Sequence, residues 1–147
     1  MADRTHLAEQ LAATTRHLYE QGWMRGTSGN VSVIAGHDPV HLLVSASGIT
    51  KHRTTIEHAV LTDHGGIAVE GQSHAPSAEA MVHAAIIAES DAHSVVHVHA
   101  MASVLAASRW PAGVVLADNE QLKGLGCPPQ GERVVVPVVR SEEHTSE

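Results

Sequence analysis

Ser94-Val95-Val96-His97-Val98-His99 is the stretch that best indicates the fold of this chain. Side chains of an extended strand alternate between two faces, so Val96 and Val98 are expected to anchor a strand in the core. His97 and His99 then share the opposite face, with their backbones roughly 6–7 Å apart. Two imidazoles placed in this way can bind one divalent ion at about 2.0–2.1 Å, the usual zinc–nitrogen distance. The alternative is a pair of ordinary strand histidines whose nitrogens are satisfied by hydrogen bonds.

Helices are expected on both sides of this strand, over about residues 77–89 and 101–108. The predicted buried stripe of the first helix is Ala80, Met81, Ala84, Ile87 and Ala88. Further predicted elements are a helix over 5–21, a hairpin of strands 31–34 and 41–44, strands over 59–62, 67–69, 114–116 and 134–136, and a short helix near 119–125. Strands that precede and alternate with helices indicate an α/β sandwich with a mainly antiparallel sheet.

The composition excludes several classes of protein. The chain has 147 residues, of which 43% are hydrophobic, enough for one domain with a core of its own. The net charge is −7 and the nine Lys and Arg residues are scattered, so no nucleic acid and no anionic membrane surface is expected as a partner. Cys127 is the single cysteine, which excludes an internal disulfide framework and favours a reducing cytosol. No apolar run approaches the length of a membrane span, so we expect a cytoplasmic protein.

Residues 140–147 form an abrupt polar stretch, Arg-Ser-Glu-Glu-His-Thr-Ser-Glu, after an apolar strand. This stretch matches one reading frame of a translated DNA-sequencing adapter, and such scars are excluded from fold reasoning. We therefore expect a domain over residues 1–139 that is incomplete at its C-terminus, followed by a non-native tail. The alternative is an ordinary frayed C-terminus.

Glu79 lies 18 residues before His97, in Pro76-Ser77-Ala78-Glu79 at the start of a predicted helix. A carboxylate beside a two-histidine metal platform is suited to metal-assisted proton transfer. The alternative role is stabilisation of the helix dipole, worth roughly 0.3–1 kcal/mol. His83, one turn further on, either hydrogen-bonds to Glu79 or only shares its face of the helix.

Two loops of small residues, Gly26–Asn30 and Ser45–Thr50, offer backbone amides and hydroxyl groups. Such groups suit a phosphate or another oxyanion, although each loop alone is typical of a turn. Ser77 stands at a helix start, where amides point outward. Together these segments predict one anion cradle.

Four motifs then resemble the class II aldolase/adducin family in their order and spacing, over nearly all of residues 6–139. They are Gly26-Thr27-Ser28-Gly29-Asn30-Val31-Ser32, Ser47-Gly48-Ile49, Pro76-Ser77-Ala78-Glu79 and Val96-His97-Val98-His99. The resemblance implies a three-layer α/β/α fold with a mainly antiparallel central sheet. It also implies a Zn²⁺ ion held by three histidines, a small phosphorylated sugar as substrate, and a homotetramer.

By this resemblance His97 and His99 are zinc ligands and Glu79 is the catalytic acid/base. The positions that match phosphate-binding residues are Asn30, Ser47, Gly48 and Ser77. Ala78 stands where aldolases of the family often have a second serine, so one phosphate contact is missing. The third zinc histidine of the family lies beyond the end of this chain, and His144 is a poor substitute. We therefore expect residues 1–147 to bind zinc weakly and to have little activity.

Pro76-Ser77-Ala78-Glu79 and the segment Asn119–Leu125 resemble the dehydratases of this family that act on methylthioribulose 1-phosphate. The leading interpretation is therefore a zinc-dependent lyase that dehydrates 5-methylthioribulose 1-phosphate in methionine salvage. The first alternative is a class II sugar-phosphate aldolase of the fuculose or rhamnulose phosphate type, which would use the same enediolate. The second is a non-catalytic adducin-like binding head, which would have no need of His97, His99 and Glu79.

Overall fold

The computed structural model describes residues 3–139. The described residues divide into two compact units, unit 1 up to Ala100 and unit 2 from Met101 onward, and each is described by itself. Elements of unit 1 are α1 (Arg4–Glu20), β1 (Asn30–His37), β2 (Val40–Ser45), the 3₁₀ turns η1 (Lys51–Arg53) and η2 (Ile56–His58), β3 (Ala59–Thr62), α2 (Ala80–Ala88) and β4 (Ser94–His97). Elements of unit 2 are α3 (Met101–Arg109), β5 (Val114–Ala117), the 3₁₀ turn η3 (Glu120–Leu125) and β6 (Arg133–Val136).

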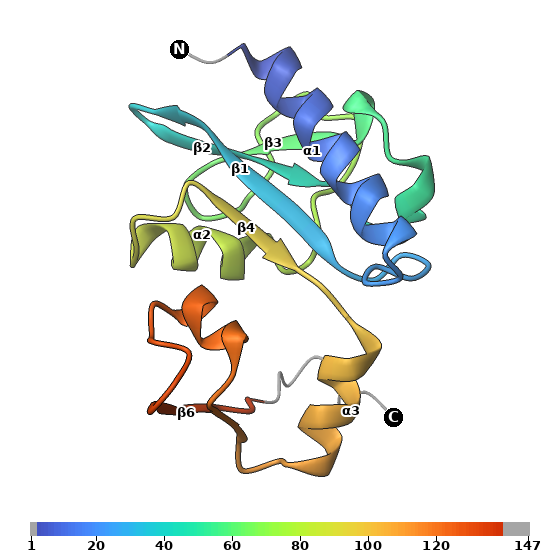
Figure 1. Ribbon diagram of the computed structural model, residues 1–147. Helices are drawn as coiled ribbons and strands as arrows, with labels where there is room; N and C mark the ends of the chain where they lie inside the picture. Colours follow the sequence, from blue (N-terminus) through green and yellow to red (C-terminus); the bar gives the residue numbers. More distant parts are fainter. Residues whose placement is uncertain (1–2, 140–147) are drawn as a thin grey trace. The chain divides into compact units, whose positions relative to one another are not determined.

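The sheet of unit 1 has the strand order β3-β2-β1-β4, and every neighbouring pair in it is antiparallel (Figure 1). β1 and β2 form the predicted hairpin, with a register irregularity between Ile34 and Gly36. On the other side of β1, Asn30 pairs with His97 and Ser32 pairs with Val95. The pairing therefore brings the start of β1 beside the end of β4.

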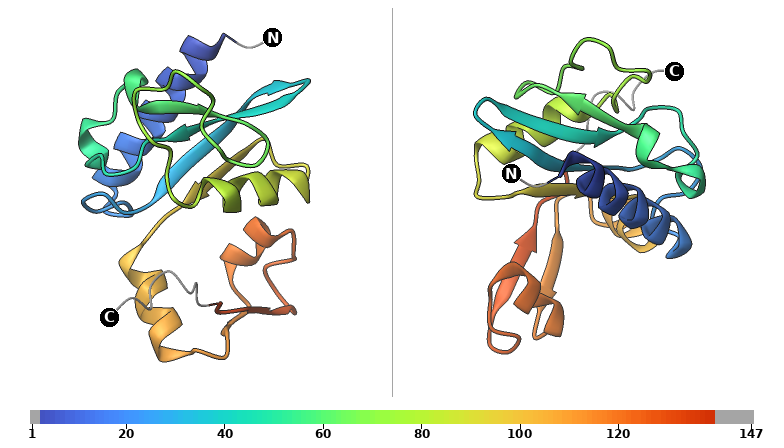
Figure 2. Two further views of the ribbon diagram at one scale, coloured as in Figure 1. Left: turned by 180° about the vertical axis from the view of Figure 1, so that it is seen from behind. Right: turned by 90° about the horizontal axis from the view of Figure 1, so that it is seen from above.

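Each face of this sheet has its own hydrophobic core. Alternation along β2 sends Leu43 to the side of α1, and Leu42 and Val44 to the side of α2. The core on the α1 side contains Ala8, Leu11, Leu18, Met24, Val31, Ala35 and Leu43, and the core on the α2 side contains Leu42, Val44, Ala80 and Ala84. Unit 1 is thus a helix–sheet–helix sandwich, as Figure 2 also shows, and the expected α/β fold with an antiparallel sheet is confirmed.

Local sequence signals explain both ends of α1. The carboxylate of Asp3 accepts a hydrogen bond from the Thr5 backbone N–H, which caps the first turn. At the other end the cap residue is Gln21, and Gly22 follows with φ +74°, a conformation in which glycine carries no steric penalty. The helix therefore stops before Gly22, and the chain continues toward the Gly26–Asn30 loop.

Three details of the sequence-based prediction are wrong. Residues 67–69 form no strand: Asp63 accepts hydrogen bonds from the Gly65 and Ile67 N–H groups, and this turn leaves only an isolated bridge between Thr62 and Ala68. The buried stripe predicted for α2 is also wrong in part: Met81 and Ala88 are exposed, and His83 is buried instead. The face of α2 that packs on the sheet therefore includes a polar side chain.

The third error concerns Val96, which is 46% exposed and does not anchor β4 in the core. β4 is an edge strand that pairs only with β1 among the described residues, so no further strand of this sheet covers the other side of Val96. Val98 does pack against the core on the α1 side. Side chains of the strand therefore alternate between the two faces as expected, but Val96 is exposed where burial was predicted.

In unit 2, β5 and β6 form an antiparallel pair, with Val115 opposite Val135. The Asn119 side chain accepts from the Gln121 N–H and begins η3, which ends at Gly126 with φ +75°. Leu122 is the one fully buried apolar side chain that the described part of this unit contains. Among residues 3–139 no helix is long and apolar enough to cross a membrane.

Candidate active site

The candidate site lies on the α2 side of the sheet, where β1 begins and β4 ends. Asn30 and His97 are direct partners across these two strands, so both side chains leave the sheet on the same face. Glu79 immediately precedes α2, which packs on that face through Ala80 and Ala84. The fold therefore brings together residues 30, 79 and 97, which are far apart in the sequence.

Glu79 is the centre of this cluster. Its Oε2 atom lies 2.6 Å from Asn30 Nδ2 and 2.6 Å from His97 Nδ1. A carboxylate can only accept, so the Asn30 amide and the His97 ring both donate to it. His97 then carries its proton on Nδ1, which leaves the lone pair of Nε2 available to a metal ion.

His99 completes the histidine pair although it lies just beyond the last residue of β4. Its backbone N–H donates to the Trp23 carbonyl at 2.8 Å, which ties this part of the chain to the loop after α1. The rings of His97 and His99 have centroids 4.7 Å apart, at an interplanar angle of 36°. The predicted approach of the two imidazoles is therefore present in the structure.

The environment keeps Glu79 ionised. Burial, the largest single influence, acts to raise the pKa of this carboxyl, but the Asn30 hydrogen bond and the charge and hydrogen bond of His97 together outweigh it. The net effect is a pKa below the ordinary value of a glutamate. The group can therefore accept a proton at neutral pH.

The donor set has the chemistry of part of a zinc site. Neutral imidazole nitrogens are preferred zinc ligands, and a carboxylate that accepts from the other nitrogen is a frequent support for such a ligand. The Nδ1 atom of His97 is hydrogen-bonded to Glu79 in this way, and the ring of His99 lies beside that of His97. The two histidines therefore fit two ligand positions of such a site. Residues 3–139 contain no group of three His, Cys, Asp or Glu side chains that could hold a metal, so this pair has no third candidate ligand beside it among the described residues.

The residues of the predicted anion cradle are connected through the backbone. Ser47 donates its N–H to the Ala75 carbonyl at 2.9 Å, and the Ser77 N–H donates to the Ser45 carbonyl at 3.1 Å. Gly48 has φ +70° and open space where a side chain would be, and both Ser47 and Gly48 are exposed. The end of β2 and the segment before α2 therefore lie side by side, as a common cradle requires. The side-chain amide of Asn30, in contrast, donates a hydrogen bond to Glu79.

A second polar contact between β1 and α2 lies behind this cluster. Ser32 is two residues after Asn30, and His83 is one turn after Glu79; the Ser32 hydroxyl lies 2.7 Å from His83 Nδ1. His83 is 1% exposed, and burial lowers its pKa to about 4, so the ring is neutral. The sequence did not decide which residue contacts His83. The structure shows that it is Ser32. Residues two apart on a strand share a face, so the position of Ser32 relative to Asn30 could have indicated this contact.

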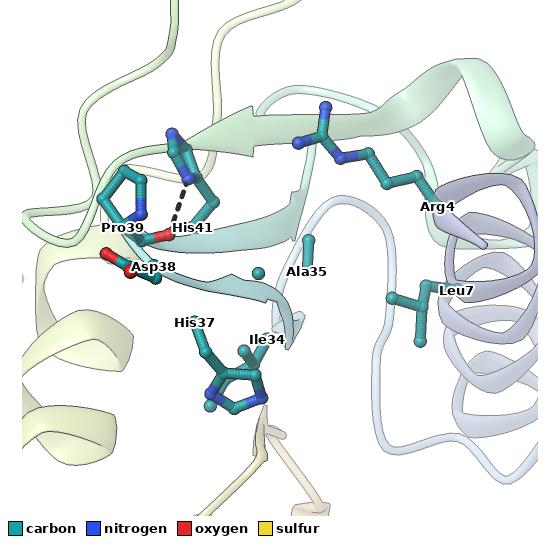
Figure 3. Close-up of a pocket in the computed structure, with 9 residues that line it drawn as sticks. Arg4, Leu7, Ile34, Ala35, His37, Asp38, Pro39 and His41 are labelled. Atoms are coloured by element: carbon teal, nitrogen blue, oxygen red, sulfur yellow. Dashed lines mark hydrogen bonds between the residues drawn. The ribbon is translucent and has the colours of Figure 1, made fainter. Parts of the chain in front are cut away.

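A separate hollow lies at the β1–β2 hairpin and is lined in part by Arg4, His37 and His41 (Figure 3). His41 Nδ1 lies 3.0 Å from the Pro39 carbonyl in this hollow. The residues that line it include none of the candidate site residues. This hollow is therefore separate from the cluster around Glu79.

Comparison with known proteins places these observations in a family. The model of the "Class II Aldolase and Adducin N-terminal domain" matches residues 9–146. Methylthioribulose-1-phosphate dehydratases of Bacillus mycoides (strain KBAB4) and Bacillus cereus (strain B4264) are each 31% identical to the chain over 134 residues. The alignment covers 91% of this chain and 63% of each relative, so the chain spans less than two thirds of their length.

Solved structures of aldolases share the fold. An L-fuculose 1-phosphate aldolase from Glaciozyma antarctica PI12 superimposes with a TM-score of 0.63 at 22% identity, over 80% of this chain and 49% of that one. An L-fuculose-1-phosphate aldolase from Thermus thermophilus has a TM-score of 0.59 at 28% identity, over 86% and 60%. Since the family model matches most of the chain, this protein belongs to the class II aldolase and adducin family.

Proposed function

We propose that the protein is a zinc-dependent lyase that dehydrates 5-methylthioribulose 1-phosphate. The observation that carries this proposal is the ionised Glu79 carboxylate, held 2.6 Å from Nδ1 of a histidine whose other nitrogen is free for a metal. Ala78, the segment Asn119–Leu125 and the 31% identity to dehydratases favour dehydration within the family. The substrate phosphate would bind at Ser47, Gly48, Ser77 and Asn30.

In the proposed mechanism His97 and His99 hold the zinc ion. When bound, zinc supplies Lewis-acid polarisation of the substrate carbonyl at C2. Glu79 accepts the proton from C3, and the electron pair of the broken C3–H bond forms an enediolate. The C4–O bond then breaks, and the leaving hydroxyl takes the proton from Glu79 and departs as water. The remaining enol tautomerises to a 2,3-diketone, so Glu79 ends the cycle ionised.

Asn30 and His97 would prepare Glu79 for both steps. Their two hydrogen bonds fix the carboxylate between β1 and α2 and lower its pKa, so the base is ionised before substrate binds. Its remaining exposure of 27% leaves a path for a substrate atom to reach it. A fixed base in a partly dry site transfers protons faster than a mobile one in water.

The second candidate is a sugar-phosphate aldolase, which would form the same enediolate but break the C3–C4 bond. The observation in its favour is the likeness to the aldolase of Thermus thermophilus at 28% identity. The adducin-like binding head is the third candidate, and the contact between Glu79 and His97 has no purpose in it. We further propose a cytoplasmic homotetramer, on the basis of the single cysteine and of the family resemblance.

The experiment is incubation of the chain with zinc chloride and 5-methylthioribulose 1-phosphate, followed by identification of the products. Dehydration yields the 2,3-diketone phosphate, whereas aldol cleavage of the same compound yields dihydroxyacetone phosphate and methylthioacetaldehyde. Slow formation of the diketone, in keeping with the weak zinc binding expected of residues 1–147, and its loss in Glu79→Gln are the expected result. Release of dihydroxyacetone phosphate would instead establish the aldolase, and turnover by neither route would refute catalysis by this chain.

A further inference from the structure

The two lysines of this chain occupy opposite environments. Lys123 is exposed, and its ammonium forms an ion pair with Glu120 at 2.6 Å. Lys51 is 2% exposed, and no carboxylate of the described residues lies within ion-pair distance of it. A buried lysine without a partner is unusual, because charged groups inside proteins are normally paired.

The ammonium of Lys51 is not fully enclosed although the residue is buried. The fully enclosed side-chain atoms without a partner, among residues 3–139, are Asn30 Oδ1, Thr54 Oγ1 and His83 Nε2. Lys51 Nζ is not one of them, although no acceptor in the described part of the chain bonds to it, so Nζ reaches solvent. The side chain is therefore almost entirely buried, and its ammonium keeps only a small solvent-accessible area.

The backbone places this residue at the junction of the two small-residue loops. The Lys51 N–H donates to the Gly26 carbonyl at 3.0 Å, which joins the end of the Ser47–Thr50 loop to the start of the Gly26–Asn30 loop. Ser47, at the other end of its loop, donates to Ala75 beside Ser77. Backbone hydrogen bonds thus tie all three segments of the predicted anion cradle together, and Lys51 makes one of these bonds.

The neighbours of Lys51 on η1 point elsewhere. The ring of His52 packs against Tyr19 of α1, with centroids 5.1 Å apart, and Arg53 is exposed. Burial lowers the pKa of Lys51, because an ammonium is poorly solvated there. An anion bound beside it would offset this cost, and no protein group among the described residues does so.

We propose that Lys51 is the cation of an oxyanion site formed by the loops Gly26–Asn30 and Ser47–Thr50. Its ligand would be the phosphate group of the substrate, an identification that rests on the proposed function. Backbone amides of the loops would surround the phosphate oxygens, and the ammonium would neutralise their charge. Lys51 would thus compensate for the serine hydroxyl that Ala78 does not provide.

The test uses inorganic phosphate, because this probe requires neither turnover nor a metal. The melting temperature of the full chain is measured against phosphate concentration at constant ionic strength, for the wild type, Lys51→Met and Arg53→Met. Arg53→Met is the matched control, since it removes one positive charge from the same 3₁₀ turn at an exposed position. We expect a saturable rise in the wild type and in Arg53→Met, and an apparent Kd roughly 10- to 100-fold weaker in Lys51→Met.

Lys51→Met without phosphate should melt at or above the temperature of the wild type, because it removes a poorly solvated charge. A second measurement avoids substitution altogether: amine-reactive labelling followed by peptide mass mapping compares the two lysines in one sample. Phosphate should slow the labelling of Lys51 and leave that of Lys123 unchanged. This measurement decides the question if Lys51→Met fails to fold.

The outcomes separate this inference from the proposed function. Equal phosphate responses of the wild type and Lys51→Met, or equal labelling with and without phosphate, would overturn the role of Lys51 alone. A wild type without any saturable response would overturn both the role of Lys51 and a phosphorylated substrate. A response that depends on Lys51 in a chain without lyase activity would support the site and refute the reaction.

Discussion

The two units of the chain differ in how they bury their apolar residues. Apart from Leu122, every fully buried apolar side chain of the described residues lies in unit 1, on one face or the other of its sheet. The hairpin of unit 2 has exposed valines instead, among them Val115, Val135 and Val136. Burial of apolar surface is the main source of stability, so unit 1 has the larger intrinsic stability.

The difference matters because every residue of the candidate site belongs to unit 1. Asn30 and His97 stand on strands that are paired with each other, and Glu79 begins a helix that is packed on one of the two cores. Side chains held by packed elements keep their geometry without substrate. The candidate site is thus built on the part of the described chain that has its own hydrophobic cores.

The substitution Glu79→Gln tests whether the catalytic carboxylate lies in unit 1, and its expected effect on turnover is the largest of those predicted here. Glutamine has nearly the same shape and still accepts a hydrogen bond from His97, but it cannot take a proton from the substrate. Turnover should fall by about 10²- to 10⁴-fold, the usual contribution of a general acid/base, while the circular dichroism spectrum stays unchanged. Product formation under saturating substrate is the measurement.

Glu132→Gln provides the control in unit 2, since Glu132 is exposed and its carboxylate bonds to no other described residue. This variant should retain full turnover. Full turnover in Glu79→Gln, or an equal loss in both variants, would contradict the assignment of the catalytic carboxylate to unit 1.

Two leucine truncations test the difference in stability. Leu42 and Leu122 are both 0% exposed, but Leu42 belongs to a core and Leu122 is isolated. Leu42→Ala should lower the free energy of unfolding of unit 1 by about 2–5 kcal/mol. Leu122→Ala should increase hydrogen exchange in unit 2 only, because its opening does not require unit 1 to unfold. Hydrogen exchange with mass spectrometry distinguishes the units, and loss of protection in β1 and β2 of Leu122→Ala would break the comparison.

The sequence predicted most of unit 1 because its signals are local and periodic. The bounds of α1 lie within one residue of the predicted helix over 5–21, and β1 and β2 contain the predicted strands 31–34 and 41–44. The pair of His97 and His99 followed from the period of two in a strand. These signals require no knowledge of distant segments.

Errors arose where distant segments decide the outcome. Burial of His83 in place of Met81 depends on Ser32, which lies on another element and offers a polar partner inside the sandwich. Exposure of Val96 depends on the position of β4 at the edge of the sheet. The burial of Lys51 could not be predicted, because a single lysine in a loop is normally exposed to solvent and nothing in its neighbouring sequence indicates otherwise.

His83 predicts a pH dependence that unit 2 lacks, since residues 101–139 contain no histidine. Burial lowers the pKa of His83 from 6.5 to about 4, so the unfolded chain binds a proton at a higher pH than the folded one. The contribution of the neutral His83 ring to the free energy of unfolding is fully present above pH ~6.5 and is lost as the pH falls toward ~4. The loss is on the order of 3 kcal/mol.

Urea unfolding of the wild type and His83→Gln at pH 7.5 and pH 4.5 measures this contribution. Glutamine keeps a donor and an acceptor for Ser32 but does not titrate, so the variant should lose less stability between the two pH values. Parallel pH dependence of the two proteins would show that His83 is not the buried neutral group described above.

Gly29 and Gly126 offer the smallest but most closely matched test, since they have φ values of +78° and +75° in the two units. A Cβ atom on Gly126 would meet nothing within 4 Å, so Gly126→Ala should cost only the strain of a left-handed residue, about 1–2 kcal/mol. A Cβ atom on Gly29 would lie 2.8 Å from the His97 carbonyl oxygen and 2.8 Å from Met24 Cγ. Gly29→Ala should therefore cost more and displace His97.

The distinguishing measurement is zinc affinity beside the melting temperature. Gly126→Ala should lower the melting temperature slightly and leave zinc binding unchanged, because unit 2 contributes neither candidate ligand. Gly29→Ala should weaken zinc binding as well, since the backbone that presents His97 has to move. If both alanine variants bind zinc like the wild type, the loop before β1 does not position the metal ligands. The site would then depend on β4 and Glu79 alone.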